Sequence, residues 1–141
     1  MNKYIEKLND LAIKAASQGE IPIACLIVKD DNIIAQGINC REQANKIDGH
    51  AEINAINLAA KQLNTWKLND CEMYISAEPC LMCYGAIMQA RINKVYVASR
   101  QDSNKKLRFS NYIKDDELID YSLVNEESSQ IIRDFFIKKR G

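Results

Sequence analysis

Cys80, Cys83 and His50, the chain's only histidine, are residues of the types that bind zinc. Two thiols three residues apart lie on one face of a helix, and a distant imidazole would complete a set of three protein ligands. Such a set leaves the fourth position of a tetrahedral zinc site to water, which is the arrangement of a catalytic site. Zinc lowers the pKa of bound water to about 7. The sequence therefore predicts one zinc ion per chain and a nucleophile that is available at neutral pH.

Glu52 stands two residues after His50 and is the candidate for moving protons at this site. Each of these features alone has a commoner explanation than a metal site. A first-turn glutamate usually only interacts with the helix dipole, a lone histidine is usually a surface or core residue, and a C-x-x-C can be a redox pair. The combination of all three in one chain is far more specific for a metal site. The order H-x-E followed by P-C-x-x-C is typical of zinc-dependent nucleobase deaminases, in which the glutamate is general acid and base and not a ligand.

The composition sets limits on class and location. The chain has 141 residues, near the commonest domain size, so we expect a single domain over residues 1–141. Basic and acidic residues number 19 each, so any binding to nucleic acid or membrane must rest on a local patch. Five cysteines without a secretory leader or a long apolar span predict free thiols and a cytoplasmic protein with no membrane segment. Cys25, Cys40 and Cys71 are expected to be small apolar residues in or beside strands.

Hydrophobic spacing predicts helices and strands in alternation. Apolar residues recur on one helical face before Gly19, and two apolar runs around a polar turn predict a β-hairpin. The predicted elements are a helix at 2–18, strands at 21–28 and 33–38, a helix at 50–63, a strand at 71–76, a helix from Pro79 to about residue 90, strands at 95–98 and 118–124, and a final helix capped by Asn125.

The predicted elements place the candidate ligands at the starts of two helices. His50 opens one helix, and Pro79 suits the first position of the next, because its missing N–H would be unpaired there. The helix dipole favours thiolates at such a start. A strand, a helix and a strand in so short a span predict a right-handed parallel crossover. The metal site should then lie where strand ends meet helix starts, as is usual in α/β proteins.

Two loops carry candidate substrate contacts. Asn39 opens the irregular segment 39–49, and its amide could pair with a base edge; an asparagine that merely ends a strand in a turn is an equal alternative. Segment 100–108 is rich in cations and follows a strand close to the predicted site. Such a run is usually only a solvated loop, and phosphate contact is here an equal alternative. The candidate RNA contacts are Arg100, Lys105, Lys106 and Arg108.

Nearly the whole chain resembles the bacterial tRNA adenosine deaminases of the cytidine deaminase-like superfamily. The stretches that carry the resemblance are Ile21-Pro22-Ile23, Gly37-Ile38-Asn39, His50-Ala51-Glu52, the E-P-C-x-M-C-x-G-A stretch Glu78–Ala86, and Asp134-Phe135-Phe136. The long E-P-C form is shared by the branch that holds tRNA adenosine, guanine and fungal-type cytosine deaminases. Two segments differ from the usual pattern: residues 46–49 stand where D-P-T-A is common, and Arg100-Gln101 where R-D precedes a glycine-containing loop.

The resemblance implies a three-layer α/β/α cytidine deaminase-like fold with a mixed five-stranded sheet. It implies that the protein binds a tRNA anticodon loop and converts its wobble adenosine to inosine by zinc-dependent hydrolysis. The residues to which it assigns roles are His50, Cys80 and Cys83 for the metal, Glu52 for the proton, and Asn39 with the backbone at Ala51 for the base.

The resemblance also implies a homodimer. The apolar Met82, Ile87, Met88 and Ile92 are candidate interface residues. Two other functions stay open: deamination of a free base or nucleoside such as cytosine or guanine, and, less favoured, a non-catalytic zinc or RNA-binding module. Glu52 argues against the module, because a structural site closes with four ligands and needs no adjacent proton carrier.

Overall fold

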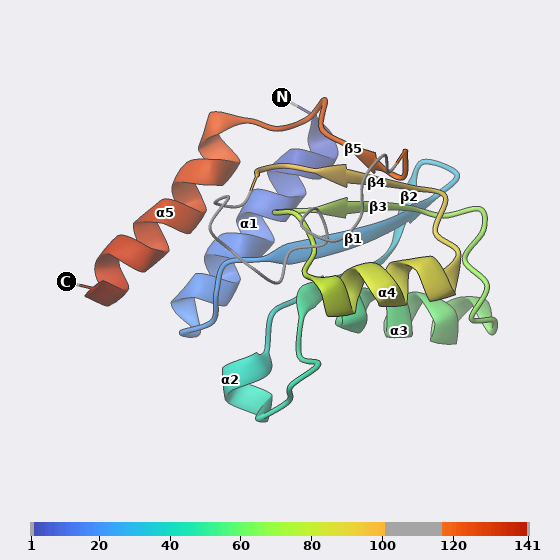
Figure 1. Cartoon of the computed structure of the whole chain (residues 1–141), viewed down its shortest axis with the longest axis horizontal. Helices are drawn as coiled ribbons and strands as arrows, with labels where there is room; N and C mark the ends of the chain where they lie inside the picture. The colour runs from blue at the N-terminus through green and yellow to red at the C-terminus, as the bar shows by residue number, and fades with distance from the viewer. Residues whose placement is uncertain (1, 101–116, 141) are drawn as a thin grey trace.

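A computed structural model of the chain describes residues 2–100 and 117–140, and Figure 1 shows how its elements are arranged. The helices are α1 (Lys3–Ser17), α2 (Arg41–Ala44), α3 (Ala51–Leu63), α4 (Leu81–Ala90) and α5 (Glu126–Arg140). The strands are β1 (Ala24–Lys29), β2 (Asn32–Ile38), β3 (Glu72–Ile75), β4 (Lys94–Val97) and β5 (Ile119–Asp120).

The five strands form one mixed sheet in the order β2-β1-β3-β4-β5. β1 runs antiparallel to both of its neighbours, whereas β3 and β4, and β4 and β5, are parallel. The parallel pairing of β3 with β4 is the one expected of two strands joined through a helix. The mixed five-stranded sheet predicted from the sequence is therefore confirmed.

Helices cover both faces of this sheet, α3 and α4 on one and α1 with α5 on the other (Figure 1). Side chains of successive strand residues point to opposite faces. Accordingly Ile27 packs in the core that includes α3 and α4, while its neighbour Leu26 packs in the core beneath α1. Met73 and Tyr74 on β3 divide between the two cores in the same way. The predicted three-layer α/β/α architecture is confirmed.

Three predicted elements have a boundary that is wrong by two residues or more, and the other boundaries agree to within one residue. The first strand begins at Ala24 and not at residue 21, because Pro22 has no N–H to donate and the Ile23 N–H bonds back to the Ile21 carbonyl. Pro79 is not the first residue of a helix, since Cys80 is the N-cap of α4. β5 has two residues instead of a strand over 118–124, because the Asp120 carboxylate accepts from the Ser122 N–H and turns the chain.

The segment at 39–49, expected to be irregular, contains the short helix α2. Glu20, which is fully buried, lies 22 residues before Glu42 and accepts hydrogen bonds from the backbone N–H groups of Glu42 and Gln43 at 3.1 and 2.8 Å. A carboxylate at a helix start pairs amides that the helix itself leaves free. Glu20 thus ties α2, which leads into His50, to the chain just before β1.

Within the described residues, no helix combines the length and apolarity needed to cross a membrane.

Candidate metal centre and active site

The structure brings the three predicted ligands together at the starts of α3 and α4. The ligand atoms of His50, Cys80 and Cys83 all lie within 4.8 Å of one another. His50 Nδ1 is 3.3 Å from Cys83 Sγ and 3.6 Å from Cys80 Sγ. One imidazole nitrogen and two thiol sulfurs in one small cluster are a donor set that suits zinc.

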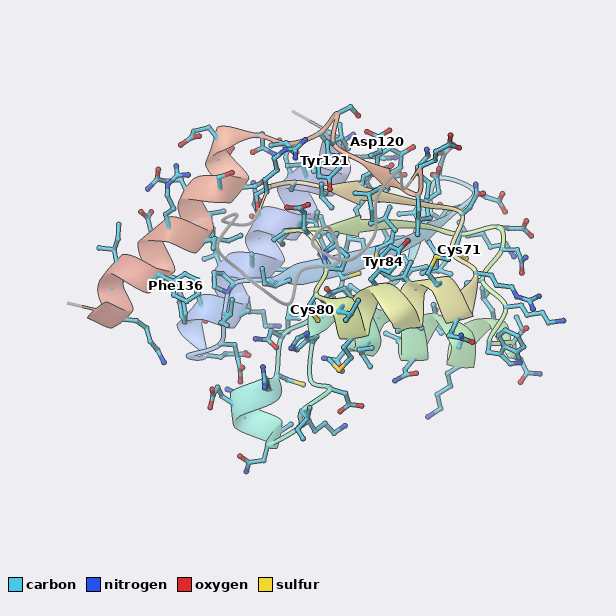
Figure 2. The ribbon with its side chains drawn as sticks, in the orientation of Figure 1. Cys71, Cys80, Tyr84, Asp120, Tyr121 and Phe136 are labelled. Carbon is cyan, nitrogen blue, oxygen red and sulfur yellow. The ribbon has the colours of Figure 1, made fainter. Side chains whose placement is uncertain are left out.

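Local backbone geometry explains why these side chains face one another. His50 is the N-cap of α3 and Cys80 the N-cap of α4, both with extended backbone, and neither side chain caps its own helix. Cys83 follows in the first turn of α4. Figure 2 shows Cys80 at the start of α4, on the side where α3 also begins. Two helix N-termini therefore point to the cluster, and their dipoles favour negative charge there.

The protonation of the cluster follows from its mutual contacts. A hydrogen bond from Cys83, helped by His50, lowers the pKa of Cys80 to about 4 against the opposing effect of burial. The same bond to Cys80, together with burial, raises the pKa of Cys83, and the hydrogen bond with Cys80 raises that of His50. The low pKa of Cys80 favours its thiolate, which accepts the hydrogen bond of the Cys83 thiol. A cation bound here would meet a preformed set of donors that includes an anionic sulfur.

Glu52 lies in the first turn of α3, with only 4% of its surface exposed, and its carboxyl group is beside the Cys83 thiol. Burial raises the pKa of Glu52 to about 7. A carboxyl group with such a pKa can both hold and release a proton near neutral pH. The arrangement therefore combines a metal-binding donor set with an adjacent group that can carry protons.

Asn39 follows directly on β2 and is buried, with 6% exposure. Its backbone N–H donates to the Ile23 carbonyl at 3.2 Å, but its side-chain Oδ1 has no hydrogen-bond partner among the described residues. Ala51, the first residue of α3, is fully buried. The strand end approaches this helix closely, since a Cβ on Gly37 would lie 2.5 Å from the Ala51 carbonyl oxygen.

Comparison with known proteins identifies the family of the chain. A family model described as MafB19-like deaminase matches residues 1–140. The chain belongs to this deaminase family. A tRNA-specific adenosine deaminase of Streptococcus pyogenes serotype M18 is 37% identical to it over 135 residues, which are 92% of this chain and 85% of that protein. The resemblance stated from the sequence is thereby confirmed.

Two solved structures extend the comparison. One, from a study of A-to-I editing by tRNA:A34 deaminases, has a TM-score of 0.67 and 33% identity, and the match covers 69% of this chain and 75% of that one. The other, a guanine deaminase from Bacillus subtilis, has a TM-score of 0.66 and 40% identity, over 71% of this chain and 66% of that one. The deaminase fold is thus shared by proteins whose names differ in the base they act on.

Of the candidate RNA contacts in the deaminase, Arg100 is exposed, and its guanidinium carbon lies 4.0 Å from the centre of the Tyr121 ring. Lys105, Lys106 and Arg108 lie outside the described residues. Tyr121, labelled in Figure 2, was missed by the sequence reasoning. Its hydroxyl donates at 2.6 Å to the carboxylate of Glu78, which directly precedes Pro79 and Cys80. No local pattern marks a partner 43 residues away.

Proposed function

We propose that this deaminase converts adenosine to inosine at the wobble position of a tRNA by zinc-dependent hydrolysis. The observation that carries the proposal is the buried Glu52 carboxyl group beside the cluster of His50, Cys80 and Cys83. The Streptococcus pyogenes relative, named for tRNA adenosine, supports the choice of substrate.

His50, Cys80 and Cys83 would hold one zinc ion, and bound zinc would supply the activation of water at neutral pH. Glu52 then takes a proton from the attacking water as the C–O bond forms at the amino-bearing carbon of the base. It returns that proton to the ring nitrogen and then carries the proton of the newly added hydroxyl group to the amino nitrogen, so that the C=O bond of the product forms. The C–N bond breaks, and ammonia and inosine are the products.

Asn39 is the proposed contact of the base, because a buried amide oxygen without a partner can accept a hydrogen bond from a ligand. The backbone N–H of Ala51 is a second proposed contact, since amides in the first turn of a helix have no partner within the helix. Arg100, Lys105, Lys106 and Arg108 are the proposed phosphate contacts. An anticodon loop suits such a site, because its bases are already unpaired and can be turned outward.

A substitution at Glu52 tests the proton carrier. Glu52→Ala should keep zinc and fold but lower turnover by at least about 10,000-fold, because general acid–base catalysis by one group is typically worth about 100- to 10,000-fold and Glu52 would serve several transfers. Asn57→Ala, at an exposed position of the same helix, is the matched control and should be near wild type. If the turnover of Glu52→Ala stayed within tenfold of the wild-type value, another group would have to carry the proton.

Deamination of guanine is the second candidate, because the guanine deaminase from Bacillus subtilis is 40% identical over the matched part of the chain. The two functions separate in parallel incubations with a wobble-adenosine tRNA, with guanine and with cytosine, assayed for inosine, xanthine and uracil. Inosine from the tRNA alone supports the first proposal. Turnover of a free base with an inert tRNA replaces it with the second.

We also propose a cytoplasmic homodimer that uses the exposed side of α4. Met82 and Met88 are 39% and 53% exposed there. Ile87 and Ile92, which the sequence offered as interface residues, are buried in the core, so that part of the prediction was wrong. Light scattering at micromolar concentration should give twice the mass of the chain, whereas a monomeric mass would refute the dimer.

A further inference from the structure

The side chain of Asn54 links the helix that carries Glu52 to the chain on both sides of Asn39. Asn54 Nδ2 donates to the Ile38 carbonyl oxygen at 2.9 Å and to Cys40 Sγ at 3.3 Å. These acceptors belong to the residues directly before and after Asn39. One amide group therefore contacts the chain on both sides of Asn39, at the Ile38 backbone carbonyl and at the Cys40 side chain.

Further contacts fix the position of residues 37–40. The Asn39 N–H donates to the Ile23 carbonyl, and the Cys40 N–H donates to the Gly49 carbonyl at 2.8 Å. Before them, Gly37 packs so closely on the first turn of α3 that a Cβ there would also lie 2.8 Å from the Ala55 nitrogen. The chain around Asn39 is thus held by several hydrogen bonds, and in the described part of the chain Asn54 is the one side chain of α3 that donates to both Ile38 and Cys40.

The position of the Asn39 side chain matters because its Oδ1 is buried without a partner in the described part of the chain. A buried acceptor of this kind can discriminate between ligands only if its place relative to the reacting centre is set in advance. Asn54 stands two residues after Glu52 on α3, so the same short piece of helix carries both the proposed proton carrier and the group that holds Asn39.

We propose that Asn54 is a positioning residue for the base: it holds Asn39 at a fixed place relative to Glu52, and through Asn39 it sets the orientation of the bound nucleobase. This inference rests on the proposed function in one respect, because it takes Asn39 as the contact of the base. Asn54 itself touches neither the base nor the metal ligands in this scheme.

A double-mutant cycle separates this role from a merely structural one. Asn54→Leu has a similar volume and no donor, and Asn57→Leu, on the exposed side of the same helix, is the matched control. With a wobble-adenosine stem-loop, Asn54→Leu should keep its zinc and lower kcat/KM at least tenfold. In an Asn39→Ala background the same change should cost less than twofold, because the group through which it acts is gone. An equal loss in both backgrounds, or no loss in either, would overturn the proposal.

A second readout does not depend on activity. In the protein labelled with ¹⁵N, the side-chain amide signals of Asn39 are identified by their loss in Asn39→Ala. They should shift or broaden in Asn54→Leu and stay in place in Asn57→Leu. Unchanged signals in Asn54→Leu would refute the positioning role even if the stem-loop is a substrate. An inert stem-loop with wild-type protein would instead refute the proposed function, and the amide signals would still decide the role of Asn54. If the leucine variant does not fold, Asn54→Asp keeps the side-chain shape and replaces the donor with a carboxylate oxygen, which cannot donate to the Ile38 carbonyl.

Discussion

Replacing Gly37 by alanine should displace the first turn of α3 from the end of β2. A Cβ at this position would lie 2.5 Å from the Ala51 carbonyl oxygen and 2.8 Å from the Ala55 nitrogen. Both are backbone atoms of α3, so no side-chain rotation can relieve the contact. Ordinary contact begins at 3.4 Å, so helix and strand must separate by roughly 0.9 Å at the closest point.

The stability and the activity should respond to different degrees. Overpacking of this kind typically costs about 1–3 kcal/mol. For a chain of this length that corresponds to a fall in Tm of roughly 3–12 °C. The same displacement moves Glu52, on α3, away from Asn39, at the end of β2. A misplacement of about 1 Å in a catalytic arrangement can cost about 100-fold in rate, so activity should fall by more than the loss of stability explains.

Thermal unfolding followed by circular dichroism and single-turnover deamination of a wobble-adenosine stem-loop measure the two effects, at equal zinc content. Gln36→Ala is the control, because Gln36 is the exposed neighbour on the same strand and its loss should change stability by less than about 0.5 kcal/mol. If Gly37→Ala melts within 1 °C of wild type and reacts within twofold of its rate, the close packing of β2 on α3 does not hold the site together.

Three further outcomes are expected. Elemental analysis should find no zinc in Cys83→Ala and full zinc in the control Cys71→Ala, and full zinc in Cys83→Ala would contradict the ligand assignment. Chelation of zinc should also lower the Tm of the wild-type protein, since metal binding and folding are coupled. Glu20→Ala should lower the free energy of unfolding in urea by about 2–3 kcal/mol, because it leaves two amides at the start of α2 without their charged acceptor; a loss below about 0.5 kcal/mol would show that water replaces it. Neutralising Lys105 and Lys106 should reduce the salt dependence of stem-loop binding by roughly 0.7–0.9 in log–log slope per lost phosphate contact, and an unchanged slope would remove these lysines from the RNA interface.

The sequence was most informative where a few neighbouring residues determine both structure and chemistry. Cys80 and Cys83 are three residues apart at the start of α4, so their spacing alone predicted that the two thiols share a face. The order His50-x-Glu52 likewise identified the candidate proton carrier from two nearby residues. Capping is equally local: Asn125 Oδ1 accepts from the Ser128 N–H at 2.9 Å at the start of α5, as its residue type predicted.

The sequence was least informative where one side chain serves a distant segment. The start of α2 depends on hydrogen bonds to Glu20. Glu78, directly before Pro79 and Cys80, accepts a hydrogen bond from Tyr121, which follows β5. Each partner is an ordinary polar residue whose choice of acceptor or donor is made by the tertiary fold. A period of 2 or 3.6 residues carries no information about such pairs, and so neither α2 nor Tyr121 was predicted.

The surroundings of Asn39 support the proposal that it contacts the base, one of the two interpretations that the sequence left equal. A polar residue that merely ends a strand in a turn bonds its side chain to its own backbone a short way along, as Asp120 does with the Ser122 N–H at 2.7 Å. No such bond is made by the Asn39 Oδ1, which is buried and without a partner among the described residues, while Asn54 donates to the Ile38 carbonyl on one side of it and to the Cys40 thiol on the other. Native structures pair nearly all buried polar atoms, and the exceptions gather where a ligand supplies the partner. The turn interpretation gives no reason for leaving this oxygen unpaired, whereas in the proposed complex the base would supply its hydrogen-bond donor.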